Sequence, residues 1–135
     1  MVELSLTLTL LLFILAGLVD FGRIYFALIS LNDAAQEGAV YGSFNPADIS
    51  EIQNHVLTSS SDPIDLQNDP DISMPAPTII GAPCAGLTGG EPNGIVVRVV
   101  YQFEFTMPLI GIIITSNSIP LTGEATSSIL YPPCP

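Results

Sequence analysis

Ionisable side chains are few in the first part of the chain, and their spacing indicates charge pairing in an apolar setting. Glu3 precedes a run from Leu4 to Val19 that has no ionisable group. Asp20 and Arg23 follow this run and are three residues apart, so one helix can hold them as an intrachain ion pair. Such pairing lowers the cost of placing both charges among apolar groups. The spacing favours this intrachain pair over the alternative, a pair between neighbouring subunits.

Outside this segment, no arrangement of side chains predicts catalysis. His55 is the only histidine, and no Ser or Cys stands in a recognisable nucleophile motif, so a hydrolase has little support. The acids between Asp62 and Asp71 could supply oxygen ligands for calcium, but they lack the order of acids, glycine and closing glutamate of a calcium loop. We therefore expect a solvated loop, no cofactor, no metal and no enzymatic activity.

The two cysteines, Cys84 and Cys134, are far apart in the sequence and lack the spacing of metal ligands. They form either a disulfide or two free thiols. A membrane-inserting N-terminus delivers the rest of the chain to the outside, where disulfides persist, and this bond would hold the last residues in place. We predict the disulfide; buried free cysteines are the alternative.

Charge separates the chain into an apolar and an acidic part. The 135 residues include two basic and thirteen acidic side chains, which gives a net charge of −11. This balance argues against nucleic acid and anionic lipid headgroups as partners, because both attract basic surfaces. No Lys or Arg precedes the apolar run, so we expect it to be retained rather than cleaved as a secretory signal. A soluble acidic head on an apolar stalk follows.

Residues 1–42 are predicted to form one helix that changes character along its length. Through Val19 it is apolar on all sides and nearly spans a bilayer core of roughly 30 Å, at about 1.5 Å per residue. From Asp20 it is amphipathic and can pack on a globular head. Small residues at helical spacing line this second half: Ala34, Ala35, Gly38 and Gly42. They would let a neighbouring backbone or sheet approach closely, although the last glycine can equally be a simple helix stop.

Residues 43–135 are predicted to form a β-rich globular head that begins with a short helix near 47–58. Strand signals follow at 73–80, an edge segment interrupted by two prolines, and then at 94–106 and 119–131. Tyr101, Phe103 and Phe105 alternate with polar residues, which is typical of a strand with one buried face. The fold class predicted is α+β, with a long N-terminal helix packed on a small antiparallel β-sheet.

Three N-terminal segments together resemble the TadE-type proteins, which are pilin-like subunits of tight-adherence systems within the type IV pilin superfamily. The segments are Val2–Leu6, Gly17–Arg23 and Leu31–Ser43. They contain an acid near the N-terminus, the Asp-Phe-Gly-Arg element and an Ala-Ala-x-Glu-Gly-Ala stretch in the family's order. The strand at 94–106 and the final strand are also similar to the C-terminal part of that family.

The resemblance implies a pilin-like precursor with a short basic leader, cleaved by a prepilin peptidase and extracted from the membrane by the pilus assembly machinery. The glutamate that the family places at the fifth mature position is Glu3 here, so either the mature chain starts elsewhere than Met1 or processing differs. A carboxylate inside an apolar bundle needs a partner, which the N-terminal ammonium of an adjacent subunit could supply. By this resemblance Glu3 would set subunit register, and Asp20 and Arg23 are the other two candidate residues of the filament core.

We therefore expect a structural subunit of an extracellular pilus filament, a helical homo-oligomer at the cell surface that is inserted in the inner membrane before assembly. Residues 1–25 would bundle in the filament core. One alternative is a membrane-anchored minor component of pilus assembly. Another is an anchored adhesin whose ligand site lies in the loops between residues 58 and 94.

Overall fold

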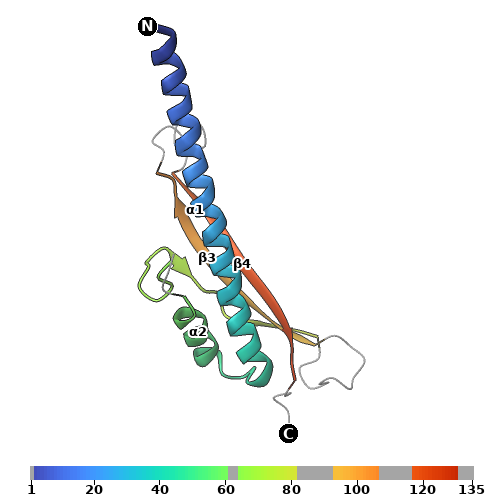
Figure 1. Cartoon of the computed structure of the whole chain (residues 1–135). Coiled ribbons are helices and arrows are strands. Elements are labelled where there is room, and N and C mark those ends of the chain that lie inside the picture. The colour runs from blue at the N-terminus through green and yellow to red at the C-terminus, as the bar shows by residue number, and fades with distance from the viewer. Residues whose placement is uncertain (1, 61–63, 82–92, 107–116, 131–135) are drawn as a thin grey trace.

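A long helix lies along a small antiparallel sheet and extends well beyond it at its N-terminal end (Figure 1). The computed structural model describes residues 2–60, 64–81, 93–106 and 117–130. Within these ranges the chain has two helices and a four-stranded sheet. This arrangement confirms the predicted α+β fold, with a long N-terminal helix packed on the sheet.

Helix α1 runs without interruption through Val2–Phe44. The segment has no proline or turn cluster, and it ends just before Asn45 and Pro46, because a proline disfavours helical backbone in the residue before it. Helix α2 follows at Ile49–Thr58, and the Asp48 carboxylate caps it by accepting the Glu51 N–H at 3.2 Å.

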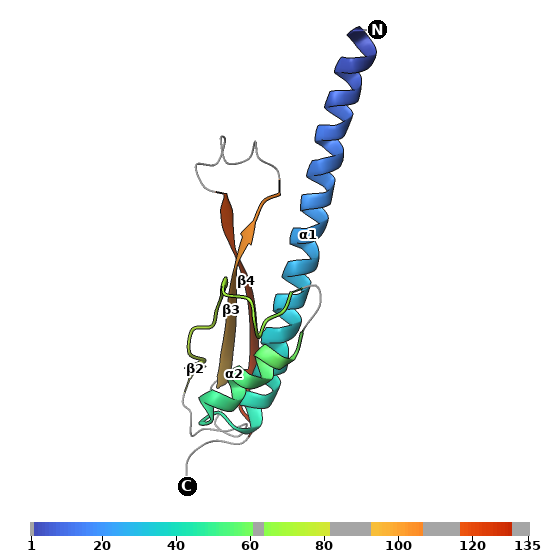
Figure 2. The ribbon, with the colours of Figure 1, turned by 90° about the vertical axis from the view of Figure 1, so that its left-hand side faces the viewer.

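Strands β3 (Gly94–Glu104) and β4 (Ser118–Ser128) form an antiparallel hairpin that is paired along its whole length. Figure 2 shows this twisted hairpin lying beside the C-terminal half of α1. The alternation predicted for β3 is observed: Phe103 is buried, while Gln102 and Glu104 are exposed. One face of the hairpin therefore packs on α1, and the other is exposed at this end of β3, whereas the first four residues of β3 are buried on both faces.

The opposite edge of β3 carries two short strands rather than one. Strand β1 (Ile72–Ser73) pairs near Tyr101, and β2 (Thr78–Ile80) pairs with the first residues of β3. The prediction of a single interrupted edge strand over 73–80 was therefore only partly right. The prolines at positions 75 and 77 lie between the two strands and cannot donate ladder hydrogen bonds, which explains the division.

The core lies between α1, α2 and the inner face of the hairpin, and it occupies only the C-terminal half of α1. Its largest fully buried side chains come from all of these elements and from the loop after α2: Leu31, Ile52, Val56, Leu66, Ile95, Val97, Val99 and Ile129. No residue of α1 before Asp20 belongs to it. The N-terminal half of the helix is thus folded without a core around it.

Candidate functional site

The apolar part of α1 is uncovered in the isolated chain. Every large apolar side chain from Leu4 to Val19 is exposed, from 48% at Phe13 to 75% at Leu4. Of the residues that the structure describes, only α1 forms a helix long and apolar enough to cross a membrane. An α-helix satisfies its own backbone hydrogen bonds, so it can enter lipid or an apolar assembly without further partners for the main chain.

Glu3 lies at the exposed start of this segment. Its carboxylate makes no hydrogen bond or ion pair with any other described residue, while its carbonyl oxygen accepts a hydrogen bond from Thr7 Oγ1 at 3.0 Å. Thr9 Oγ1 likewise donates to the Ser5 carbonyl at 2.8 Å. These hydroxyls are satisfied by their own helix, which suits an apolar setting. The carboxylate of Glu3 is therefore the group of this segment that most needs an external partner.

Asp20 and Arg23 form an ion pair within the chain, with Arg23 Nη1 3.4 Å from Asp20 Oδ1. The Asp20 side chain is only 4% exposed and that of Arg23 is 48% exposed. Arg23 Nη1 also donates a hydrogen bond to Thr106 Oγ1, just beyond β3, and the guanidinium lies 5.0 Å from the centre of the Phe103 ring. One arginine thus joins α1 to the end of the hairpin.

The structure does not bring all three predicted charges together. Glu3 is seventeen positions from Asp20 on a continuous helix, which is roughly 25 Å at about 1.5 Å per residue. Within one chain, Glu3 is therefore isolated and the other two residues mark where the head begins. The contacts of Arg23 with Thr106 and Phe103 were not predicted from the sequence. No sequence pattern shows which residues of a helix lie beside which residues of a strand.

The predicted small residues face the inside of the head. A Cβ added to Gly38 would overlap the Val56 side chain, and one added to Gly42 would lie 2.8 Å from Ile95 Cδ1. Both glycines therefore let α2 and β3 approach α1 closely. Gly42 does not stop the helix, because α1 continues to Phe44.

Ala34 and Ala35 are also buried in the head, at 1% and 0% exposure. With the two glycines, they serve packing within the chain. This inner face of α1 is occupied, so another molecule could contact only the other faces.

A third glycine contact was not foreseen. A Cβ added to Gly123 in β4 would lie 2.5 Å from the carbonyl carbon and oxygen of Leu31 and 2.8 Å from the Asn32 nitrogen. The strand backbone therefore rests on the helix backbone. Asn32 Oδ1 accepts the N–H of Glu124 at 3.4 Å beside this contact. An isolated glycine inside a strand is a signal of such close approach.

The acidic loop is organised by turns. Asp65 Oδ2 accepts a hydrogen bond from Asn68 Nδ2 at 2.8 Å, and Asp65 Oδ1 accepts the N–H groups of Gln67 and Asn68. The side-chain bond from Asn68 is the main reason that the pKa of Asp65 is lowered. Among the described residues, no group of three or more His, Cys, Asp or Glu side chains is placed to hold a metal ion.

Several predictions fall on residues outside the described ranges. They are the disulfide between Cys84 and Cys134 and the contribution of Asp62 to the acidic loop. Parts of the loops considered for an adhesin, residues 61–63 and 82–92, also lie outside.

Two polar rings close to the core have packing contacts. The His55 ring stacks on Tyr41 with the ring centres 4.1 Å apart, which joins α2 to α1.

Burial is the main reason that the pKa of Tyr101 is raised above its usual value, and the negative charges of Asp69 and Asp71 raise it further.

The described part of the chain thus combines an uncovered helix, long and apolar enough to cross a membrane, with a small α+β head, an arrangement that fits a membrane-anchored protein. Residues 1–40 match the family described as TadE-like protein, and this match covers most of α1. The resemblance predicted from the sequence is thereby confirmed for the N-terminal part of the chain. A comparison with curated proteins and a comparison with solved structures each give no match.

The TadE-like match associates the chain with Tad pili and with assembly by the pilus machinery. The family consists of pilus components rather than enzymes. The apolar N-terminal helix fits a membrane-anchored component of a surface pilus.

Proposed function

We propose that the protein is a structural subunit of an extracellular pilus filament, assembled by packing of its N-terminal helices. The observation that carries this proposal is the exposed apolar surface of α1 from Leu4 to Val19. Removing such surface from water is worth roughly 25 cal/mol per Å². In the membrane, lipid covers it; in the filament, the same segments of neighbouring copies cover it. Many identical contacts then stabilise the fibre, with the acidic heads outside.

In this proposal Glu3 sets the register between copies. A carboxylate inside an apolar bundle is strongly unfavourable unless it is paired. The isolated position of Glu3 supports an external partner, for which we propose the N-terminal ammonium of an adjacent subunit after cleavage by a prepilin peptidase. Asp20 and Arg23 mark the other end of the bundled segment, where the head begins.

Electron microscopy of purified filaments tests this function. We expect density for heads around a central bundle of helices, and heads without a central bundle would contradict the proposal. Replacing Glu3 by Gln should reduce the yield of filaments, since it removes the register contact and leaves the helix intact. Glu51→Gln is the matched control, because Glu51 is an exposed acid on the head. Equal yields from the two variants would argue against the role of Glu3.

A second candidate function is a membrane-anchored minor component of pilus assembly. The length and composition of α1 favour it equally, because a helix that can cross a bilayer can also remain there. Shearing of cells followed by fractionation separates the two functions. A filament subunit is released with the sheared material. If nearly all of the protein stays with the membranes, the minor component is correct and the filament subunit is not.

A further inference from the structure

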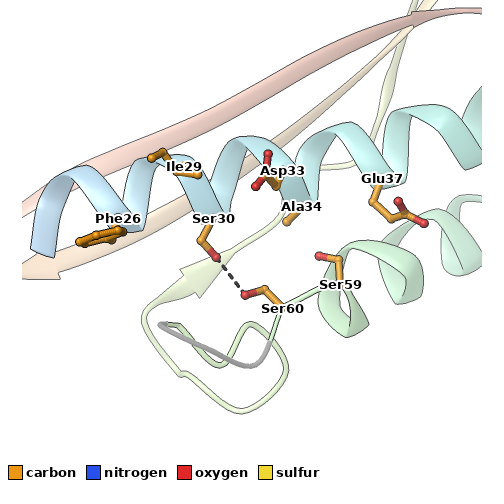
Figure 3. A pocket seen from close by; sticks show the side chains of 8 residues that line it. All are labelled: Phe26, Ile29, Ser30, Asp33, Ala34, Glu37, Ser59 and Ser60. Atoms are coloured by element: carbon orange, nitrogen blue, oxygen red, sulfur yellow. Dashed lines mark hydrogen bonds between the residues drawn. The ribbon is translucent and has the colours of Figure 1, made fainter.

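A groove of about 420 Å³ lies between α1 and the residues at the end of α2 (Figure 3). Its helix wall is made by residues spaced three or four apart, so they share one face: Phe26, Ile29, Ser30, Asp33, Ala34 and Glu37. Ser59 and Ser60 form the opposite wall, and Ser30 Oγ lies 2.9 Å from Ser60 Oγ across the groove. The groove is built by the fold and is open to solvent.

One end of the groove is apolar and the other is acidic. Phe26 is 61% and Ile29 is 41% exposed, which is high for large apolar side chains on a packed head. Asp33 and Glu37 are one turn apart and exposed, and neither forms an ion pair or hydrogen bond with another described residue. Like charges at this spacing repel each other. A ligand of this face therefore has to be apolar at one end and positively charged at the other.

Gly22 lies on the same face, one turn before Phe26. A Cβ added there would meet no atom within 4 Å, unlike those added to Gly38, Gly42 and Gly123. A glycine in a helix lowers helix stability relative to alanine, and no contact within the described chain requires one at this position. Exposed glycines on helices are used where another helix approaches closely. Gly22 thus points independently to a helical neighbour on this face.

The charges of this chain argue against a second copy as that neighbour. The sequence has only two basic side chains, and both are engaged: Arg23 with Asp20, and Arg98 with Glu124 at 2.6 Å. Another copy would bring a further net charge of −11 to an acidic groove. The cation that complements this groove has to come from a protein of different composition.

We propose that the face formed by Gly22, Phe26, Ile29, Asp33 and Glu37 docks a helix of a second, different protein. A small or aliphatic residue of that helix lies over Gly22, apolar residues cover Phe26 and Ile29, and Lys or Arg side chains reach Asp33 and Glu37. This docking is separate from the packing of the N-terminal segments and does not depend on the proposed filament.

Site-specific photocrosslinking in the native cells tests the proposal. Full-length protein carrying benzoylphenylalanine at Ile29 is irradiated, and the adduct is digested and sequenced. We expect a helical segment of another protein with Lys or Arg within about two turns of the crosslink. The double variant Asp33→Asn and Glu37→Gln should lower the yield about fivefold or more, as loss of two ion pairs implies. Glu51→Gln with Glu104→Gln is the matched control, because it removes two exposed charges elsewhere on the head and should leave the yield unchanged.

A second variant, Gly22→Leu, keeps the test independent of charge. The added side chain enters open space and removes a helical glycine, so helix content and stability should be at least those of the wild type, while the adduct should be lost. An adduct between two copies of this chain overturns the proposal, and so does an adduct whose yield is unaffected by the groove variants. Absence of any adduct from Ile29, when the same probe at Leu11 does form adducts, overturns it as well.

Discussion

Replacement of Gly123 by Ala should destabilise the head, because β4 lies directly on the backbone of α1. The new methyl group would be 2.5 Å from Leu31 C and O, and backbone atoms cannot turn aside as the end of a flexible side chain can. Such overpacking costs about 1–3 kcal/mol. Alanine recovers about 0.4–1 kcal/mol by restricting the unfolded chain. We therefore expect a net loss of about 1–2 kcal/mol in the free energy of unfolding.

Chemical unfolding of the full-length protein in mild detergent, followed by circular dichroism, measures this loss. Gly22→Ala is the matched control, since its methyl group meets nothing within 4 Å. In the middle of a helix that change should raise stability by about 0.5–1 kcal/mol. The same chemical substitution is thus expected to act with opposite sign at two sites. A Gly123→Ala protein as stable as the wild type would refute the close contact between strand and helix.

Three further predictions concern the packing and charges of the head. Gly38→Ala should cost about 1–3 kcal/mol by overlap with Val56, and a double-mutant cycle with Val56→Ala should show that the smaller partner relieves part of the cost. The raised pKa of Tyr101 means that the folded state favours the neutral phenol, so its contribution is complete below the unfolded pKa of about 10 and is lost as the pH rises through the folded pKa. Unfolding midpoints above pH 10 should therefore fall more steeply for the wild type than for Tyr101→Phe, and parallel curves would contradict this. Arg98→Gln should cost only about 0.2–1 kcal/mol, less in high salt, because its ion pair with Glu124 is half exposed.

The sequence predicts the elements better than their contacts. The extent of α1 and the alternation of β3 follow from local periodicity, which each segment carries in its own residues. The division of the predicted edge segment into β1 and β2 depends on the pairing of each with β3 as well as on the prolines. The segment's own residues do not reveal that pairing. The contacts of Arg23 with Thr106 and of Gly123 with Leu31 depend on how the hairpin is placed along the helix. That placement is set by tertiary packing, so no single segment reveals it.

The length of the hairpin explains why the apolar half of α1 needs other molecules. The hairpin is fixed to the helix near both ends, by Arg23 with Thr106 and by the Leu130 N–H that donates to the Ser43 carbonyl at 2.8 Å. Strand β4 has 11 residues, or roughly 36 Å at about 3.3 Å per residue, which matches the roughly 30 Å of α1 between those contacts. The helix before Asp20 is roughly 27 Å long, close to the hydrocarbon thickness of about 30 Å. Because α1 is continuous, this part cannot fold back onto the head. Its burial has to come from outside the chain: from lipid or, in the filament that we propose, from the helices of other subunits.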